Sequence, residues 1–142
     1  MEIVRVTNAK LKKLVDKFEG SQWPKADLEH YGKIKPPKKY HRFIMREHGK
    51  IVGMAEVSIE TNVACLEGLL VDETIRGQGI GTALLKKVEA FARTKGCTKI
   101  WLATGKDWKA ASFYKKHGFE ITAVLKEHVF NQDEVLMTKF LK

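Results

Sequence analysis

The sequence has little of what several protein classes need. It holds only 2 cysteines and 3 prolines in 142 residues, and no uninterrupted apolar run is long enough to span a bilayer. Two cysteines cannot form a zinc site alone, and a chain of this length buries a core without a disulfide scaffold. No repeat or linker divides it. We therefore expect a single domain over residues 1–142, a cytoplasmic location, no membrane contact and no metal site.

The charge is positive and unevenly distributed. The formal net charge is +9, and residues 1–50 contribute +7 of it. Residues 33–42 hold five basic residues and no acidic one. Such an excess attracts anions, such as nucleic acid, an acidic protein or a phosphorylated cofactor, although it equally serves solubility.

Apolar spacing predicts the elements of the first third of the chain. Residues 2–6 alternate as a strand does, and residues 8–18 have the spacing of a helix, with Asn8 as its N-cap and Gly20 as its end. Residues 22–39 contain all three prolines and read mainly as a loop, in which residues 26–31 could form a short helix.

The remaining two thirds alternate between strand and helix patterns. The predicted strands are residues 41–47, 50–60, 64–71, 98–104, 119–126 and 134–140, and the predicted helices are residues 79–95 and 107–117. The run at 64–71 is almost wholly apolar, which indicates a strand covered on both faces. This order predicts an α/β (α+β) fold with a mixed sheet, in which the strands that flank the long helix are parallel.

A glycine-rich stretch between strand 64–71 and the long helix carries the chemistry. Gly77, Gly79 and Gly81 alternate after Arg76 and let the backbone approach a ligand closely. Unpaired N–H groups at a helix start, with the positive end of the helix dipole behind them, suit a phosphate. The spacing does not match the dinucleotide fingerprint or the nucleoside-triphosphate loop. The alternative is a turn that serves only packing.

Two motifs resemble those of the GNAT superfamily of acyl-CoA-dependent N-acyltransferases. The family signature Gln/Arg-x-x-Gly-x-Gly/Ala is matched by Arg76, Gly79 and Gly81, and a second signature is matched by residues 110–119, AASFYKKHGF. One departure is visible, because family members often carry Asn where this chain has Asp107. We expect Asp107 to cap the helix, and the resemblance places it where the family's Asn bonds to the pantetheine arm of the cofactor.

The resemblance implies a mostly antiparallel sheet with a central, splayed pair of parallel strands, and acetyl-CoA as cosubstrate. The pantetheine arm would lie between the splayed strands, and the Val71 N–H would polarise the thioester carbonyl. It also implies a homodimer and an amine acceptor, either a small molecule or a protein amine. The expected cofactor-binding residues are Leu69, Val71, Arg76, Gly77, Gln78, Gly79, Ile80, Gly81, Thr82, Asp107 and Tyr114.

Two side chains are candidates for proton transfer. Tyr114 lies in the second motif and could protonate the leaving thiolate, since a phenol is a suitable donor to an alkyl thiolate. Its alternative role is an aromatic core residue beside Phe113 and Phe119. Glu67 interrupts the apolar strand and could accept a proton from the attacking amine, directly or through water. Its alternative role is that of an ion-paired strand residue, and Glu56 and Glu60 rank below it as the base.

The prediction is therefore an N-acetyltransferase that acts by direct attack in a ternary complex. Two alternatives stay open. A basic nucleic-acid-binding module would explain the charge, although no recognition motif accompanies it. A CoA-binding regulatory domain without turnover would explain the glycine loop.

Overall fold

The computed structural model describes residues 1–142, which form two compact units, Met1–Pro36 and Pro37–Lys142. The first unit is built on one helix, α1 (Ala9–Tyr31). Asn8 is its N-cap, as predicted, and its Oδ1 accepts a hydrogen bond from the Leu11 N–H at 2.9 Å. Gly32, in the left-handed region at φ 71°, ends it.

Three predictions for this unit are wrong. Residues 22–31, expected mainly as a loop, belong to α1. The helix does not end at Gly20 but continues through Gly20 and Pro24 to Tyr31. Residues 2–6 form no strand, because no neighbouring strand pairs with them and an alternating pattern alone cannot satisfy strand hydrogen bonds.

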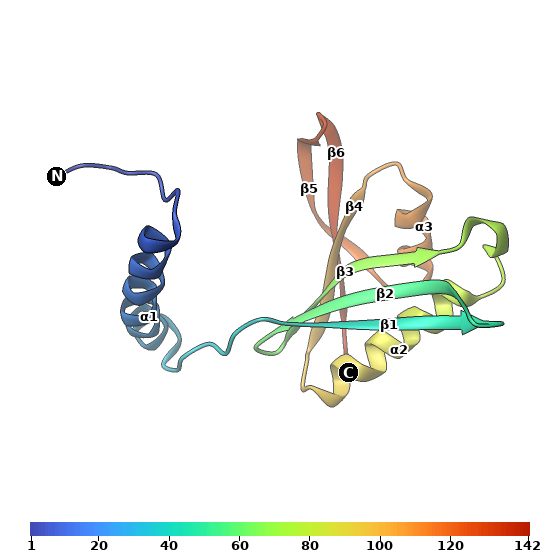
Figure 1. Ribbon diagram of the computed structural model, residues 1–142. Coiled ribbons are helices and arrows are strands. Elements are labelled where there is room, and N and C mark those ends of the chain that lie inside the picture. The colour runs from blue at the N-terminus through green and yellow to red at the C-terminus, as the bar shows by residue number, and fades with distance from the viewer. The chain divides into compact units, whose positions relative to one another are not determined.

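The second unit is a six-stranded sheet with two helices and a short 3-10 turn (Figure 1). The strand order is β1-β2-β3-β4-β6-β5, and every neighbouring pair is antiparallel except β3 and β4. This confirms the predicted fold class. The elements are β1 (Lys39–Glu47), β2 (Lys50–Glu60), β3 (Val63–Val71), η1 (Glu73–Ile75), α2 (Ile80–Thr94), β4 (Lys99–Gly105), α3 (Lys109–Lys116), β5 (Glu120–Val129) and β6 (Gln132–Phe140).

The turns follow from local sequence. His48 and Gly49 both have positive φ, which is the backbone of the two-residue hairpin turn that joins β1 to β2. Gly96, at φ 76°, follows the end of α2. The turn between β5 and β6 lies at Phe130 and Asn131, both with positive φ.

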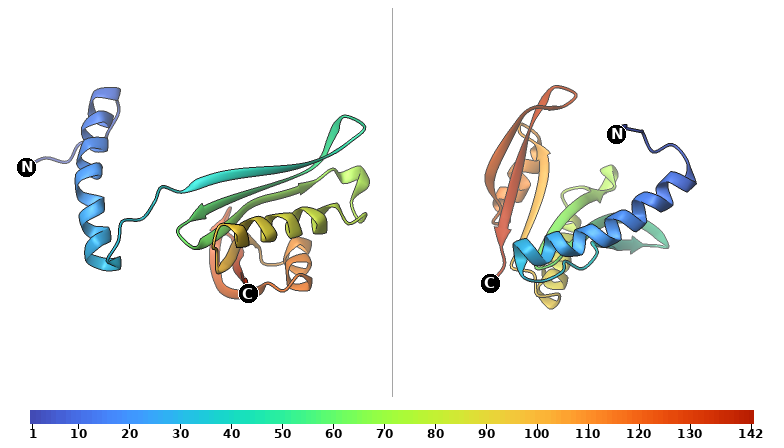
Figure 2. Two further views of the ribbon diagram at one scale, coloured as in Figure 1. Left: turned by 90° about the horizontal axis from the view of Figure 1, so that it is seen from below. Right: turned by 90° about the vertical axis from the view of Figure 1, so that its left-hand side faces the viewer.

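The core lies between α2 and the sheet. Helix α2 packs along one face of β1, β2 and β3, and α3 packs on β4 (Figure 2). The largest fully buried side chains come from α2 and from the three strands β2, β4 and β6. They include Leu85, Val88, Val57, Ile100, Leu102, Val135 and Met137.

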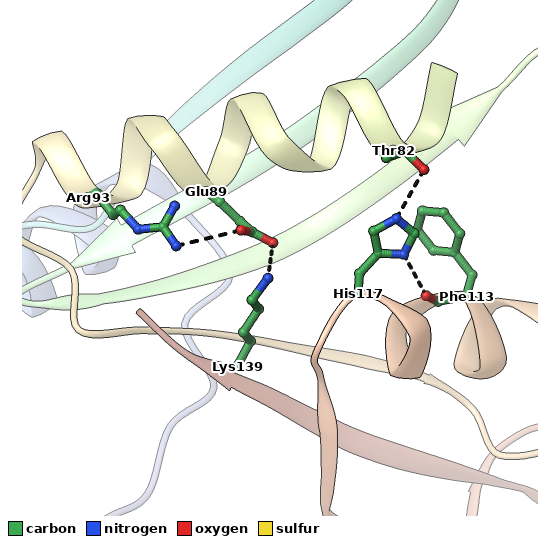
Figure 3. Close-up of polar contacts among 6 residues, drawn as sticks. All are labelled: Thr82, Glu89, Arg93, Phe113, His117 and Lys139. Atoms are coloured by element: carbon green, nitrogen blue, oxygen red, sulfur yellow. Dashed lines mark hydrogen bonds and ion pairs between the residues drawn. The ribbon is translucent and has the colours of Figure 1, made fainter. Parts of the chain in front are cut away.

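One buried ion pair ties α2 to β6 (Figure 3). Glu89 is only 7% exposed, and its Oε1 lies 2.8 Å from Lys139 Nζ. Its other oxygen lies 3.8 Å from Arg93 Nη2, one helical turn along α2. A protein interior accommodates a buried carboxylate only when it has such partners, so these contacts hold α2 close to β6.

Candidate active site

The parallel pair β3 and β4 opens into a splayed gap. Only three Cα pairs join these strands, ending at Cys65 and Trp101, although β3 continues to Val71 and β4 to Gly105. Beyond that point each strand stays paired only with its outer neighbour, β3 with β2 and β4 with β6. The predicted splay is therefore present.

The register of β3 directs the main-chain groups of two of its residues, Leu69 and Val71, toward this gap. The Asp72 N–H donates to the Val52 carbonyl at 2.9 Å, which marks a hydrogen-bonded pair between the two strands. Such pairs alternate with non-hydrogen-bonded ones, so Leu69 and Val71 do not bond to β2. Their N–H and C=O groups point to the opposite side, where β4 has diverged. The side chains at these positions have no part in this arrangement.

The loop after β3 is held by local contacts. Asp72 Oδ1 accepts hydrogen bonds from the N–H and the hydroxyl of Thr74, at 2.9 and 2.7 Å, and these bonds lower the pKa of Asp72. Arg76 Nε donates to the Val71 carbonyl at 3.3 Å. Since that carbonyl is occupied, Val71 has only its N–H to offer a ligand in the gap.

The three glycines of the loop have different roles. Gly77 and Gly79 have φ of 81° and 82°, and a Cβ at either would meet no atom within 4 Å. They are required by backbone conformation and border open space. Gly81 lies inside α2, where a Cβ would be 3.5 Å from the Phe113 ring and 3.7 Å from Val71. These are ordinary van der Waals distances, so a Cβ would fit at Gly81, and neither space nor backbone conformation requires glycine there.

The start of α2 presents main-chain amides without acceptors in the helix. The first intrahelical bond is donated by Ala83 to the Gly79 carbonyl at 3.0 Å, and no side chain caps the helix at Gly79. The N–H groups of Ile80, Gly81 and Thr82 precede that bond. They lie next to the unobstructed Gly77 and Gly79, so this turn has the geometry of an anion site.

Glu67 is exposed, which corrects the expectation of a strand covered on both faces. It occupies a β-bulge, because Glu56 pairs with Gly68 while Val57 pairs with Leu66, and the extra residue bends the strand. Its Oε1 accepts a hydrogen bond from the hydroxyl of buried Ser58 at 2.5 Å. The other candidate bases form ion pairs, Glu56 with Arg42 and Glu60 with Lys38.

Glu67 also affects the neighbouring thiol. Burial raises the pKa of Cys65 to about 12, and the charge of Glu67 and its hydrogen bond with the thiol add to this. Burial also raises the pKa of Cys97. Neither cysteine therefore forms a reactive thiolate at neutral pH.

Tyr114 has a ring packed in the core and a hydroxyl at the protein surface. Tyr114 is 8% exposed. Its ring packs edge-on against the rings of Phe113 and Phe119, and the distances between ring centroids are 5.2 and 5.6 Å. The hydroxyl makes no hydrogen bond within the protein, yet no unpaired side-chain oxygen is fully buried, so it keeps contact with solvent. Burial raises the pKa of Tyr114 to about 12, so the phenol keeps its proton at neutral pH.

The prediction that Asp107 caps the third helix is wrong. The N-cap of α3 is Trp108, and no side chain caps the helix there. Asp107 lies one residue outside the helix and is exposed, so it cannot reach the orphan N–H groups as an N-cap does. The Trp108 indole instead lies over Gly105, where a Cβ would be 2.4 Å from the ring.

Two residues that position the site were missed in the sequence. Gly53, on β2, is buried beneath α2, and a Cβ there would lie 2.8 Å from Ile80 and 2.9 Å from Leu84. It lets the first turn of α2 approach the sheet, and an isolated glycine within a strand pattern is the signal for such contact. Ser58 gave no signal, because its role depends on the bulge at Glu67.

Comparison with known proteins identifies the family. A model of the acetyltransferase (GNAT) family matches residues 8–119. The chain belongs to the GNAT acetyltransferase family. A crystal structure of an acetyltransferase from Bacillus cereus superposes with a TM-score of 0.74 at 25% identity, covering 99% of this chain and 98% of that one.

Two further GNAT relatives carry more specific descriptions. A glucosamine 6-phosphate N-acetyltransferase from Trypanosoma brucei brucei is 34% identical over 84 residues, which are 54% of this chain and 56% of that protein. A GNAT structure from Elizabethkingia anophelis with acetyl-CoA bound has a TM-score of 0.67 at 20% identity, covering 99% and 95% of the two chains. The chain spans about half the length of the curated relatives it matches.

No helix is both long and apolar enough to cross a membrane. No three His, Cys, Asp or Glu side chains gather as metal ligands would.

Proposed function

We propose that this GNAT protein transfers an acetyl group from acetyl-CoA to a primary amine by direct attack in a ternary complex. The observation that carries the proposal is the splayed gap between β3 and β4, bordered by the main-chain N–H and C=O of Leu69 and the N–H of Val71. The gap leads to the amides at the start of α2. One relative is named for acetylating an amino sugar, and one neighbour of the same fold holds acetyl-CoA.

The cofactor would be held mainly by backbone. In this proposal the groups of Leu69 and Val71 hold the pantetheine arm, and the Val71 N–H polarises the thioester carbonyl. The N–H groups from Gln78 to Thr82 bind the diphosphate at the positive end of the α2 dipole. Arg76 and Gly77 shape the approach to this turn, and Asp107 borders the pantetheine side.

Glu67 and Tyr114 would handle the protons. The lone pair of the neutral amine attacks the thioester carbon, the C–S bond breaks, and an amide and a thiolate form. Glu67 takes the proton that the amine loses, directly or through a water molecule. The Tyr114 hydroxyl donates a hydrogen bond to the leaving thiolate. Because the pKa of Tyr114 is about 12, well above the pKa of about 8.5 of an alkyl thiol, this is stabilisation rather than complete proton transfer.

Three finer features belong to the proposal. The acceptor is a small-molecule or protein amine, the protein is a homodimer, and it acts in the cytoplasm. The unpaired cysteines Cys65 and Cys97 support a reducing compartment. Nothing in the fold supports a nucleic-acid-binding module, and a CoA-binding domain without turnover is separated from the enzyme by the second experiment below.

The first experiment measures cofactor binding. Titration calorimetry with desulfo-CoA should show binding to the wild-type protein and its loss in Gly79→Asp, which places a negative charge at the proposed diphosphate turn. Gly96→Asp is a matched control, because Gly96 also has positive φ and open space but lies at the other end of α2. Gly79→Asn separates the added charge from backbone strain. Equal binding by folded Gly79→Asp would refute the placement.

The second experiment measures turnover. A panel of primary amines, amino sugars and peptides is screened for release of CoA from acetyl-CoA. Release with any amine supports an acetyltransferase. Tight desulfo-CoA binding without release across the whole panel would favour the regulatory domain instead.

A further inference from the structure

The last turn of α3 is joined to the first turn of α2 by a histidine (Figure 3). His117 Nδ1 lies 2.8 Å from the Phe113 carbonyl oxygen, and Nε2 lies 3.0 Å from Thr82 Oγ1. A carbonyl oxygen can only accept, so Nδ1 carries a proton. In the neutral ring Nε2 then accepts from the Thr82 hydroxyl, so the Phe113 carbonyl sets the tautomer and the hydroxyl adapts to it.

The bridge ends at the turn that presents the free amides. Thr82 is the third residue of α2, and its N–H is among those without an intrahelical acceptor. On the other side, the Phe113 ring lies 4.4 Å from the His117 ring, and its edge faces Gly81. Phe113 therefore lies beside Gly81, and His117 hydrogen-bonds to Thr82. These are two adjacent residues of the proposed diphosphate turn.

The same helix holds the proposed hydrogen-bond donor. Tyr114 follows Phe113 in α3, and the N–H of the helix-ending His117 bonds back to the Tyr114 carbonyl at 3.0 Å. A single side chain therefore links the segment that would bind the diphosphate to the segment that would act at the thioester. The thioester and the diphosphate lie at the two ends of the pantetheine arm of acetyl-CoA, so the relative placement of the two segments affects its binding.

We propose that His117 is a positioning residue for acetyl-CoA, which preorganises the amides at the start of α2 through Thr82. This inference rests on the proposed function, since it assigns His117 to the same cofactor site. It goes beyond a helix-ending role, in which the imidazole would matter for stability alone. Preorganised donors bind an anion more tightly because less order is lost on binding.

The test compares variants that cut the bridge from either side. Thr82→Val removes only the hydroxyl and leaves the main-chain N–H, and His117→Leu removes the imidazole. Each should raise the Kd for desulfo-CoA and the KM for acetyl-CoA by roughly three- to tenfold, the worth of one hydrogen bond. The KM for the acceptor amine should stay unchanged in both variants. The double variant should be no weaker than the worse single one, because both remove the same contact.

Two further variants separate positioning from stability. His117→Gln keeps an amide within reach of Thr82 and should recover part of the lost affinity. His128→Leu, an exposed histidine on β5, is the control for removing an imidazole elsewhere. Thermal unfolding of all variants identifies any that are unfolded.

The outcomes are distinct. Wild-type affinity in folded Thr82→Val and His117→Leu, or losses that simply add in the double variant, would overturn the inference. Failure of the wild-type protein itself to bind desulfo-CoA would overturn the proposed function instead.

Discussion

Replacing Tyr114 with phenylalanine isolates the chemistry of its hydroxyl from the packing of its ring. The ring contacts Phe113 and Phe119 and is buried, whereas the hydroxyl has no partner within the protein. Tyr114→Phe leaves those contacts and orphans no other polar group. The free energy of unfolding at neutral pH should therefore change by no more than about 0.5 kcal/mol.

The rate should fall much further than the stability. A hydrogen bond to a charged group contributes about 1.5–3 kcal/mol, and the leaving thiolate is charged only as the C–S bond breaks. Losing it should lower kcat roughly 10- to 150-fold. The KM for acetyl-CoA should change less, since a thioester sulfur accepts hydrogen bonds weakly before reaction.

The assay is steady-state release of CoA at saturating acetyl-CoA and amine, with desulfo-CoA binding measured in parallel. Wild-type kcat in a folded Tyr114→Phe protein would refute the assigned role. A variant that lost cofactor binding together with kcat would instead show that the hydroxyl serves binding.

Alkaline stability gives a second check on the same residue. Burial raises the pKa of Tyr114 from about 10 to about 12, so its neutral form stabilises the fold below pH 10 and that contribution is lost as the pH rises through 12. The raised pKa of Cys65 acts in the same direction from about pH 9 to pH 12. Between pH 10 and pH 12 the free energy of unfolding should fall less steeply with pH in Tyr114→Phe than in the wild-type protein. An unchanged slope would contradict the raised pKa of Tyr114.

Two other substitutions test the base and the core. Glu67→Gln should lower kcat/KM at pH 7 by about a hundredfold. The difference from the wild-type protein should become smaller as the pH approaches the pKa of the acceptor amine, about 10, because the amine is then neutral without a base. Equal values of kcat/KM at pH 7 would exclude Glu67 as the base. Lys139→Met should reduce the free energy of unfolding by about 2 kcal/mol, because it leaves buried Glu89 with only the more distant Arg93. Lys86→Met, at an exposed position on α2, should change it far less in the same denaturant titration, and equal losses would show that the buried pair has no special weight.

The second unit was predictable because its elements carry strong periodic signals. The long helix has an apolar face that matches α2, and the predicted strands correspond to β1 through β6 with boundaries that differ by a few residues. The first unit shows the limit of the same reasoning. Gly20 and Pro24 both disfavour a helix interior, yet α1 runs through them, since propensity is outweighed where flanking turns are helical.

Local signals also mislead when two residues could serve the same end of a helix. Asp107 is a better N-cap than Trp108 by side-chain chemistry. The chain nevertheless begins α3 after Trp108, whose indole lies over Gly105 and whose N–H bonds to the Gly105 carbonyl at 3.1 Å. A contact with a residue outside the helix therefore determines where α3 begins. The preference of a residue type for the N-cap position gives no information on such a contact.

The glycines of the site show how sequence and geometry divide the evidence. A run of spaced glycines indicates close approach of backbone, but not to what. The structure separates Gly77 and Gly79, whose positive φ leaves amides beside open space, from Gly53, which lets α2 lie against β2. At Gly81 a Cβ would fit beside Phe113, so this glycine is not required by packing.

The same division applies to the groups that would hold the pantetheine arm. Any side chain at Leu69 or Val71 would leave their N–H groups where they are, because the Asp72–Val52 bond sets the register and β4 diverges after Trp101. A site of this kind depends on strand pairing rather than residue identity. The two side chains of the proposed mechanism depend on local structure as well. Glu67 is an exposed carboxylate at a bulge in β3, and Tyr114 is carried by α3, which packs on β4. Substitutions at Leu69 and Val71 that keep the strand should therefore matter less than loss of either proton-handling group.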